Sequence, residues 1–426
     1  MSVVYAPSQS DASWTSIVCR SRARSTTTKL VCGPYVVRSG RAKDRTSGAV
    51  RGMARPRQRA ADRVKRDGLL ESRALPRGTE ARLSSRLVTV IITGGAGFIG
   101  SNAVARFLTL GYRVAVLDNL SRPGAEENLV WLRGMGLSEF ARLDVRDPAA
   151  VQTFVGQHRD ATLLLHLASQ VAVTRAIDDP REDFETNVGG TVNVLEAVRA
   201  TWPDASRAPL VVYSSTNKVY GSLPETVTSE TARRFVAASG WRGVGEDHEL
   251  RPETPHAVSK AAAEAYLRAY AYSYGIPTVT FRQSCIYGPR QLGAEEQGWV
   301  AWLALCAARR QAVRLYGDGR QVRDLLHVDD LVDAFIAAWQ RRESLRGDAF
   351  NLGGGPALTL SLRELIEDLE RRTGRPVTTE THPWRVGDQK IYVSCIDKAA
   401  RALDWHPRIG LEPGLEDLWS WVRSRA

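Results

Sequence analysis

The sequence predicts a doubly wound α/β fold, in which helices cover both faces of a parallel sheet, followed by a smaller C-terminal domain. Between residues 88 and 285, short apolar runs alternate with stretches of helical spacing, which is typical of strand–helix–strand units. A glycine-rich stretch lies at the first turn from strand to helix. After residue 285 the order of elements is less regular, which indicates the second domain.

The individual elements follow from the spacing of their apolar residues. Apolar, often β-branched runs predict strands at 87–95, 112–119, 140–145, 162–168 and 209–216. Helical spacing predicts helices at 101–112, which stops at Gly111, and at 187–200, 256–275, 331–342 and 361–374. We therefore expect one domain over 88–285. We expect 286–426 to form most of a second domain, with segments that return to the first core.

Residues 1–87 differ in composition from the rest of the chain. They contain 19 Lys and Arg against 6 Asp and Glu, a net charge of +13, whereas the remainder carries −2. This Arg- and Ser-rich segment has little apolar periodicity, so we expect disorder. It can be a tail that binds nucleic acid or an anionic surface, or an organellar transit segment. We favour a start codon assigned too early, with the native chain beginning near Val88.

Charge and cysteine usage argue against several classes of function. Because the excess charge lies in residues 1–87, the pI near 9.6 gives no reason to expect nucleic-acid binding. No apolar run approaches the roughly 20 residues that span a bilayer, and no secretory signal is visible. The five cysteines form no CxxC pair and no zinc-type cluster with histidine. We expect reduced thiols, no metal and no membrane contact in a cytoplasmic protein.

The stretch TGGAGFIG places Gly94, Gly97 and Gly100 between the first strand and the first helix. In a dinucleotide-binding loop, these glycines permit the tight turn, the approach of a pyrophosphate and the packing of helix on strand. The alternative is a tight turn without a ligand. Asp118 favours the dinucleotide, because it ends the second strand, where an acid bonds the adenosine ribose hydroxyls. A carboxylate there repels a 2′-phosphate, which favours NAD over NADP.

Beyond these patterns, residues 88–426 resemble the extended short-chain dehydrogenases/reductases that act on nucleotide sugars. The resemblance is carried by TGGAGFIGSN, DNLSRPGAEENLVWL, HLASQVAVT, NVGGTVNVLEAV, SSTNKVYG, QGWVAW and GDGRQVRDLLHVDDL. DNLSRPGA, SSTNKVYG and QGWVAW are the more specific stretches, and they are similar to those of 2-epimerases of CDP-activated deoxyhexoses. The resemblance implies a Rossmann-like NAD domain, a nucleotide-sugar substrate and a homodimer or homotetramer.

The resemblance also implies which residues contact NAD. These are Gly94, Gly97, Phe98, Ile99 and Gly100 at the pyrophosphate, Asp118 and Asn119 at the adenosine ribose, Asp144 and Val145 at the adenine, Leu167, Ala168 and Gln170 along the central part, and Lys260 at the nicotinamide ribose. Ser169 stands where the family has glycine, a small change that leaves binding plausible.

On the substrate side, Thr216 matches the family's catalytic Ser/Thr, and Arg323 and Arg385 match arginines that grip the diphosphate. The alternative for each arginine is a surface ion pair, and Arg323 has Asp324 beside it. Related 4,6-dehydratases have Asp-Glu after the threonine. Asn217 and the lysine after it are not acids, which argues against elimination and leaves Asn217 as a substrate contact.

The stretch TPHAVSK, residues 254–260, aligns with the family's Tyr-x-x-x-Lys and places His256 at the tyrosine position. Imidazole, with an ordinary pKa of about 6.5, is a competent base, although a lysine cation nearby lowers that pKa. Its reach is shorter than that of a phenol by roughly 2 Å, a gap that a bridging water can close. We take Thr216, His256 and Lys260 as the candidate catalytic residues.

Three other interpretations of His256 stay open. Thr216 or a nearby tyrosine can have taken over as the base, the protein can bind its ligands with little turnover, or the ring is inert in the first helical turn. The expected activity is NAD-dependent 2-epimerisation of a CDP-deoxyhexose through a keto intermediate. The alternatives are a 4-epimerase or dehydrogenase of another nucleotide sugar, or a non-catalytic protein that binds NAD and a nucleotide sugar.

A start near Val88 predicts that the native protein lacks residues 1–87. Intact-mass measurement of the protein from its natural source checks this expectation. A native chain that retains these residues contradicts it.

Overall fold

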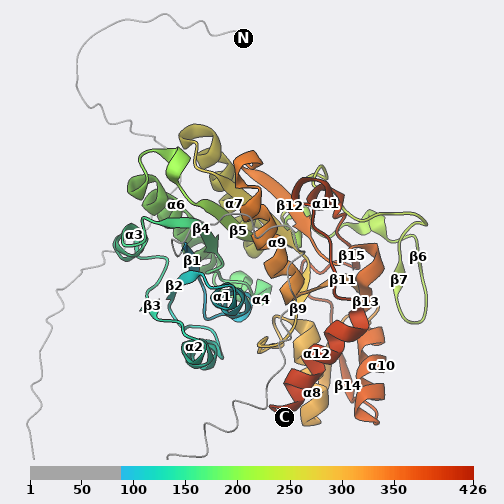
Figure 1. Cartoon of the computed structure of the whole chain (residues 1–426). Coiled ribbons are helices and arrows are strands. Elements are labelled where there is room, and N and C mark those ends of the chain that lie inside the picture. Colours follow the sequence, from blue (N-terminus) through green and yellow to red (C-terminus); the bar gives the residue numbers. More distant parts are fainter. Residues whose placement is uncertain (1–87) are drawn as a thin grey trace, which may run out of the picture. The chain divides into compact units, whose positions relative to one another are not determined.

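Seven parallel strands form the main sheet of residues 88–426, the part of the chain that the computed structural model describes. Our predictions for residues 1–87 lie outside the described residues. The sheet has the order β12-β8-β5-β4-β1-β2-β3 (Figure 1). Its strands are β1 (Thr89–Thr93), β2 (Arg113–Asp118), β3 (Glu139–Arg142), β4 (Ala161–His166), β5 (Leu210–Thr216), β8 (Thr278–Gln283) and β12 (Asp348–Leu352). The strand order reverses between β1 and β4, which is where such sheets bind ligands.

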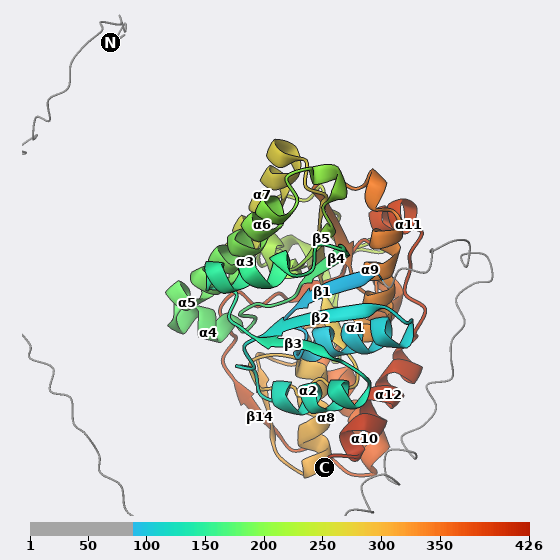
Figure 2. The same cartoon turned by 60° about the vertical axis from the view of Figure 1, so that its left-hand side comes forward.

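Helices cover both faces of this sheet. One face packs on α1 (Phe98–Thr109), α2 (Ala125–Gly134), α9 (Val328–Gln340) and α11 (Asp397–Leu403). The other packs on α3 (Pro148–Gly156), α6 (Gly190–Thr201) and α7 (Pro255–Tyr274). Val90 and Ile92 enter the first core, and Ile91 between them enters the second. Figure 2 shows α3 and α6 on one side of β1 and β2, and α1 and α2 on the other. The predicted doubly wound fold is confirmed.

A second group of elements follows β8 along the chain. Its strands are β9 (Cys285–Tyr287), β10 (Val313–Tyr316), β11 (Val322–His327), β13 (Thr359–Ser361), β14 (Thr379–His382) and β15 (Ile391–Tyr392). They form two small sheets, β10-β14 and β13-β11-β15 with β9 on β11. The helices α8 (Trp299–Arg309), α10 (Leu362–Thr373) and α12 (Leu411–Arg423) share a third core with them. Because β12 joins the main sheet and α9 packs on one of its faces, the C-terminal part of the chain returns to the first core.

Most predicted elements lie within a few residues of the observed ones. The helix predicted from residue 101 begins at Phe98, directly after the N-cap residue Gly97. A short π-helix (Glu185–Gly189) leads into α6, and the short helices α4 (Val173–Asp178) and α5 (Pro180–Phe184) precede it. A two-stranded pair, β6 (Ser229–Glu230) and β7 (Phe235–Val236), completes the described strands. No helix of residues 88–426 is long and apolar enough to cross a membrane.

The helix α7 is the element that carries the TPHAVSK stretch. Thr254 caps it, because the threonine hydroxyl accepts the backbone N–H of Ala257 at 3.3 Å. Pro255 occupies the first helical position, where its missing N–H costs nothing. Gly275 ends the helix with a left-handed conformation. These signals fix the start of α7 and so the places of His256 and Lys260 in its first two turns.

The capping box at the start of α10 provides a test of the described structure. The Ser361 hydroxyl accepts the N–H of Glu364 at 3.1 Å, and the Glu364 carboxylate accepts the N–H of Ser361 at 2.9 Å. Ser361→Ala should lower the free energy of unfolding by about 1–2 kcal/mol, measured by denaturant unfolding. The control Ser344→Ala changes an exposed serine and should stay within about 0.5 kcal/mol of the unchanged protein. Equal unfolding midpoints for both variants would contradict the role of the cap.

Candidate active site

The glycine loop after β1 leaves room for a ligand on one side only. Gly94 has a φ of +70°, and a Cβ there would lie 2.6 Å from the backbone nitrogen of Ala168. A Cβ on Gly100 would lie 2.1 Å from the Gly94 carbonyl oxygen. A Cβ on Gly97 would meet only the Gly94 carbonyl oxygen, at 3.2 Å, which is a close contact but less severe than the other two. Packing therefore requires glycine at positions 94 and 100 and is less restrictive at Gly97, beside which there is space for a ligand.

A cavity of about 370 Å³ fills that space at the carboxyl ends of the parallel strands. Of the residues predicted to contact NAD, its lining contains Gly94, Gly97, Phe98, Ile99, Gly100, Asp118, Asn119, Val145, Leu167 and Ala168. Ser169, which stands where the family has glycine, also lines it. Asp144, Gln170 and Lys260 lie outside this lining. No side chain caps the N-terminus of α1, so its first N–H groups are available to an anion.

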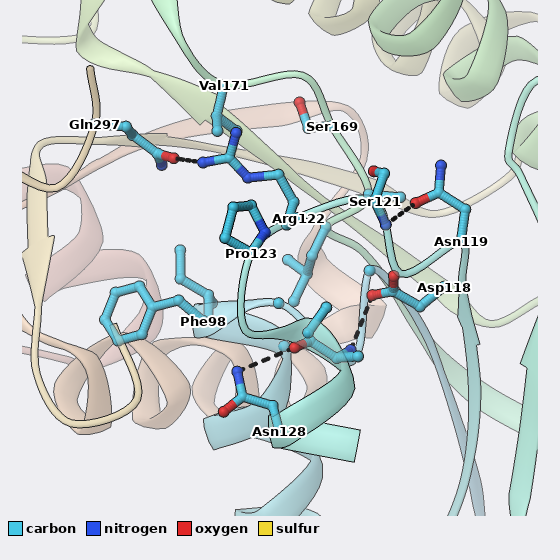
Figure 3. A pocket seen from close by; sticks show the side chains of 18 of the residues that line it. Phe98, Asp118, Asn119, Ser121, Arg122, Pro123, Asn128, Ser169, Val171 and Gln297 are labelled. Carbon is cyan, nitrogen blue, oxygen red and sulfur yellow. Dashed lines mark hydrogen bonds between the residues drawn. The ribbon is translucent and has the colours of Figure 1, made fainter. Parts of the chain in front are cut away.

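Asp118 lies on the cavity wall with its carboxylate held by the backbone. It accepts the N–H group of Ala96 at 2.9 Å (Figure 3). It also accepts the N–H group of Leu120 at 2.7 Å. Burial raises the pKa of Asp118 above its ordinary value, and these hydrogen bonds oppose the increase. Asn119 beside it donates to Asp144 at 3.0 Å. An uncapped helix start, a space beside glycine and an acid at the end of β2 together fit a dinucleotide.

Three arginines in the lining, Arg122, Arg175 and Arg290, were missed by sequence reasoning. Arg122 lies in the loop after β2 and donates to Gln297, which belongs to a segment of the lining from the C-terminal half of the chain (Figure 3). Arg175 follows at the start of α4 and pairs with Glu182 at 2.7 Å. The stretch DNLSRPGA contains Arg122, and its specificity within the family is the sequence signal that could have identified this arginine. The cavity wall therefore carries three arginine cations besides the carboxylate of Asp118.

Lys260 is linked to the cavity through β5. Its Nζ donates to the backbone oxygen of Ser214 at 2.7 Å, and Ser214 also lines the cavity. The same Nζ lies 4.8 Å from the centroid of the Tyr213 ring. Burial lowers the pKa of Lys260 to about 7, against the opposing charges of Asp183 and Glu264. The lysine thus lies directly behind the strand that forms one wall of the cavity.

His256 is buried one turn before Lys260, with 4% of its surface exposed. Its Nδ1 atom is enclosed and lies 3.6 Å from Oδ1 of Asp183, beyond hydrogen-bond distance. Burial lowers the pKa of His256 below its ordinary value. Asp183 opposes that decrease, and the cations of Lys260 and Lys218 add to it.

Thr216 ends β5, and the residues after it connect to the C-terminal part of the chain. The Thr216 hydroxyl accepts the N–H of Lys218 at 3.3 Å. The Asn217 amide donates to Gln389 at 3.3 Å. Lys218 donates through Nζ to the backbone oxygen of Gly387 at 3.0 Å. The SSTNKVYG stretch is therefore joined to residues 387–389 by side-chain contacts.

The two predicted substrate arginines lie in different surroundings. Arg323 is buried and pairs with Asp388 at 2.6 Å, and Asp388 also lies 3.4 Å from Lys218. Its sequence neighbour Asp324 is engaged elsewhere, because it accepts the backbone N–H groups of Gly355 and Ser394.

Arg385 is half-buried and interacts with a second set of neighbours. It donates to the backbone oxygen of Glu295 at 2.8 Å. Its guanidinium carbon lies 3.8 Å from the centroid of the Tyr316 ring. These contacts hold the side chain by stacking and one hydrogen bond.

Fold and cavity together define a dinucleotide-binding protein of the extended short-chain dehydrogenase/reductase class. The family model described as "NAD dependent epimerase/dehydratase family" matches residues 90–353, so the chain belongs to the NAD-dependent epimerase/dehydratase family. The predicted family and its cofactor, NAD, are confirmed.

Named relatives refine this placement. CDP-paratose 2-epimerase of Salmonella typhi, the activity also called CDP-tyvelose 2-epimerase, is 38% identical over 79% of this chain and 99% of its own. UDP-glucose 4-epimerase of Mycolicibacterium smegmatis is 33% identical with the same coverage. The crystal structure of Thermus thermophilus UDP-glucose 4-epimerase in complex with NAD is 33% identical and has a TM-score of 0.68, covering 80% of this chain and 100% of that one.

The position of Gly97 on the cavity wall generates a prediction about cofactor binding. Gly97→Val should place a side chain in the cavity and weaken NAD binding at least tenfold, about 1.4 kcal/mol or more. Calorimetric titration of NAD measures the change. The control Gly134→Val lies at the end of α2 with no atom within 4 Å of a Cβ and should leave NAD affinity unchanged. Unchanged affinity in Gly97→Val would show that the cavity is not the NAD site.

Proposed function

We propose that the protein is an NAD-dependent epimerase of a nucleotide-activated sugar. The observation that carries this proposal is the position of Ser214. Ser214 lines the cavity assigned to NAD, and its backbone carbonyl oxygen accepts the hydrogen bond that Lys260 donates. A buried lysine therefore lies behind the cavity wall, and Thr216 ends the same strand two residues after Ser214. This is where a sugar carbon has to meet the cofactor.

The sugar and the carbon are the finer part of the proposal. We infer 2-epimerisation of a CDP-deoxyhexose, supported by the 38% identity to a CDP-paratose 2-epimerase and by the SSTNKVYG and QGWVAW stretches. A 4-epimerase of another nucleotide sugar is the second candidate, supported by the relatives that act on UDP-glucose. Asn217 and Lys218 offer no carboxylic acid for elimination, which disfavours dehydration.

When bound, NAD would supply the redox chemistry of the reaction, the reversible acceptance of one hydride from the sugar carbon. The chain's residues have the task of holding the cofactor and moving one proton. The start of α1 and Gly97 would face the pyrophosphate, and Asp118 the ribose hydroxyls. Lys260 would hold the nicotinamide ribose and keep a positive charge near the reacting oxygen.

We assign proton transfer to His256 with the help of Thr216. His256 would take the proton of the sugar hydroxyl as the carbon loses hydride, and would return it to the oxygen afterwards. The low pKa of His256 keeps the imidazole neutral, and so able to accept a proton, near neutral pH. Thr216 can hydrogen-bond the same hydroxyl or pass the proton along.

We assign the substrate diphosphate to Arg323 and Arg385. Arg323 presents a buried guanidinium in contact with Asp388, and Arg385 a guanidinium stacked on Tyr316. A planar fork of N–H groups suits the oxygens of a diphosphate. Asn217, tied to Gln389, would contact the sugar.

Assembly and location complete the proposal. We propose a cytoplasmic homodimer or homotetramer, in which 88–285 binds NAD and 286–426 mainly binds the sugar. Exposed apolar side chains gather on the neighbouring helices α4, α5 and α7: Ile177, Phe184, Val258 and Tyr266 are 43–56% exposed. An apolar surface of this kind is suited to burial against a second copy.

A panel of CDP-, UDP- and dTDP-activated sugars in deuterated solvent tests the function. We expect inversion at C2 of a CDP-deoxyhexose, with the reacting C–H free of solvent deuterium because the same hydride returns. Proton NMR of the product measures both.

Lys260→Ala removes the lysine side chain and its positive charge, and this variant should lower kcat on the order of 100-fold.

Two outcomes would contradict the proposal. Solvent deuterium at the inverted carbon would indicate proton abstraction instead of hydride return. An NAD-loaded protein that changes none of the sugars would favour a non-catalytic binding protein.

A further inference from the structure

Asp183 and His256 face each other inside the protein. Asp183 lies in α5 and is 1% exposed, and His256 lies in α7 and is 4% exposed. The Nδ1 atom of His256 and the Oδ2 atom of Asp183 are both enclosed, and neither has a hydrogen-bond partner among the described residues. Leaving a buried donor or acceptor unpaired costs about 1–3 kcal/mol. The distance of 3.6 Å between Nδ1 and Oδ1 needs only a small side-chain shift to become a hydrogen bond.

The Asp183 carboxylate is fixed before any such shift. Its Oδ1 atom accepts the side-chain amides of Gln170 and Asn187, each at 3.0 Å. Asn187 donates as well to the hydroxyl of Ser259, at 3.0 Å. Ser259 precedes Lys260 in α7, so the network joins the helix of the aspartate to the helix of the histidine. This arrangement gives Gln170, which lies outside the cavity lining, a place in the site.

We propose that Asp183 is a positioning residue, whose carboxylate accepts the Nδ1–H of His256 and thereby leaves Nε2 as the atom that takes the substrate proton. The proposal rests on the proposed function, because it assigns His256 as the base. A neutral imidazole has one N–H, and a lone pair on Nδ1 would face the carboxylate and be repelled. The tautomer protonated at Nδ1 is therefore favoured, as in other carboxylate–imidazole pairs. The Nδ1 atom of His256 is enclosed without a hydrogen-bond partner, whereas its Nε2 atom is not.

The charges around His256 explain why a carboxylate is needed there. A tyrosine acts as a base in its negative phenolate form, which the Lys260 cation stabilises. An imidazole acts as a base in its neutral form and becomes positive when it takes the proton, which the same cation disfavours. Lys260 in α7 and Lys218 after β5 both act against the imidazolium, and Asp183 acts in its favour. When the sugar hydroxyl gives its proton to Nε2 and the carbon gives hydride to NAD, the imidazolium stays paired with Asp183. Both the proton and the hydride then return to the sugar.

The first test measures the tautomer without turnover. Nitrogen-15 NMR of the full chain loaded with NAD, with labelled histidine, should show Nδ1 protonated and Nε2 unprotonated for His256 above its pKa. The His256→Tyr spectrum identifies the signal, because it lacks one of the seven histidines. Protonation at Nε2 would overturn the proposal, whether or not the protein turns over a sugar.

The second test removes the charge of Asp183. Asp183→Asn should lower kcat at least tenfold with little change in KM, and should move the acid limb of the pH–rate profile to lower pH. The sign follows because loss of an anion favours the neutral imidazole, whose pKa falls further below its ordinary value. The matched control Asp179→Asn changes the same charge at the exposed start of α5 and should leave rate and profile unchanged.

A structural role for Asp183 would give other results. In the His256→Tyr background, Asp183→Asn should change kcat less than threefold, because the carboxylate then has no imidazole to orient. An equal loss of kcat in both backgrounds, or an unmoved acid limb, would overturn the proposal. If Asp183→Asn fails to fold, the tautomer of His256 measured in the unchanged protein still tests the role of Asp183. Failure of the proposed function is separate, since it would appear as no epimerisation by the unchanged protein.

Discussion

A backbone contact between the ends of β1 and β4 sets the geometry of the whole site. Gly94 follows β1, and Ala168 follows β4 so closely that no Cβ fits between them. Gly100, one turn into α1, lies equally close to the Gly94 carbonyl. Because three segments meet where only hydrogen atoms fit, α1 begins directly behind the turn and directs its free N–H groups at the cavity. Asp118 then needs only the backbone of the same loop to hold its carboxylate.

Burial governs proton affinities on the other side of the cavity. Lys260 and His256 are both enclosed, and desolvation moves both toward their neutral forms. Neighbouring charges act on this background: Asp183 favours the protonated form of each, and Lys218 opposes it at His256. Lys260, whose pKa is about 7, can exchange protons near neutral pH because burial acts against the carboxylates of Asp183 and Glu264. Replacement of a phenol by an imidazole changes the sign of the charge that must be stabilised, so the carboxylate is the more useful neighbour.

The sequence predicted what depends on local spacing. Strands buried on both faces appear as apolar runs, and the glycine loop and Asp118 are separated by a fixed distance within one strand–helix–strand unit. Contacts between distant segments were not predictable in this way. Arg122 meets Gln297 across 175 residues, and Arg323 pairs with Asp388, 65 residues away, although Asp324 is its neighbour in sequence. Asp183 has no motif of its own and is recognised only by what it faces.

The carboxylate of Asp388, shared by Arg323 and Lys218, has a consequence for ligand exchange. The buried guanidinium avoids the cost of a lone charge because it already has an anionic partner. In the proposed function, an arriving phosphate would replace one anion by another, and its affinity would reflect the difference between two ion pairs. The displaced carboxylate would stay tethered beside the arginine as an internal competitor at high effective concentration. Such a resident anion would weaken the binding of a departing product and favour repeated turnover over tight retention.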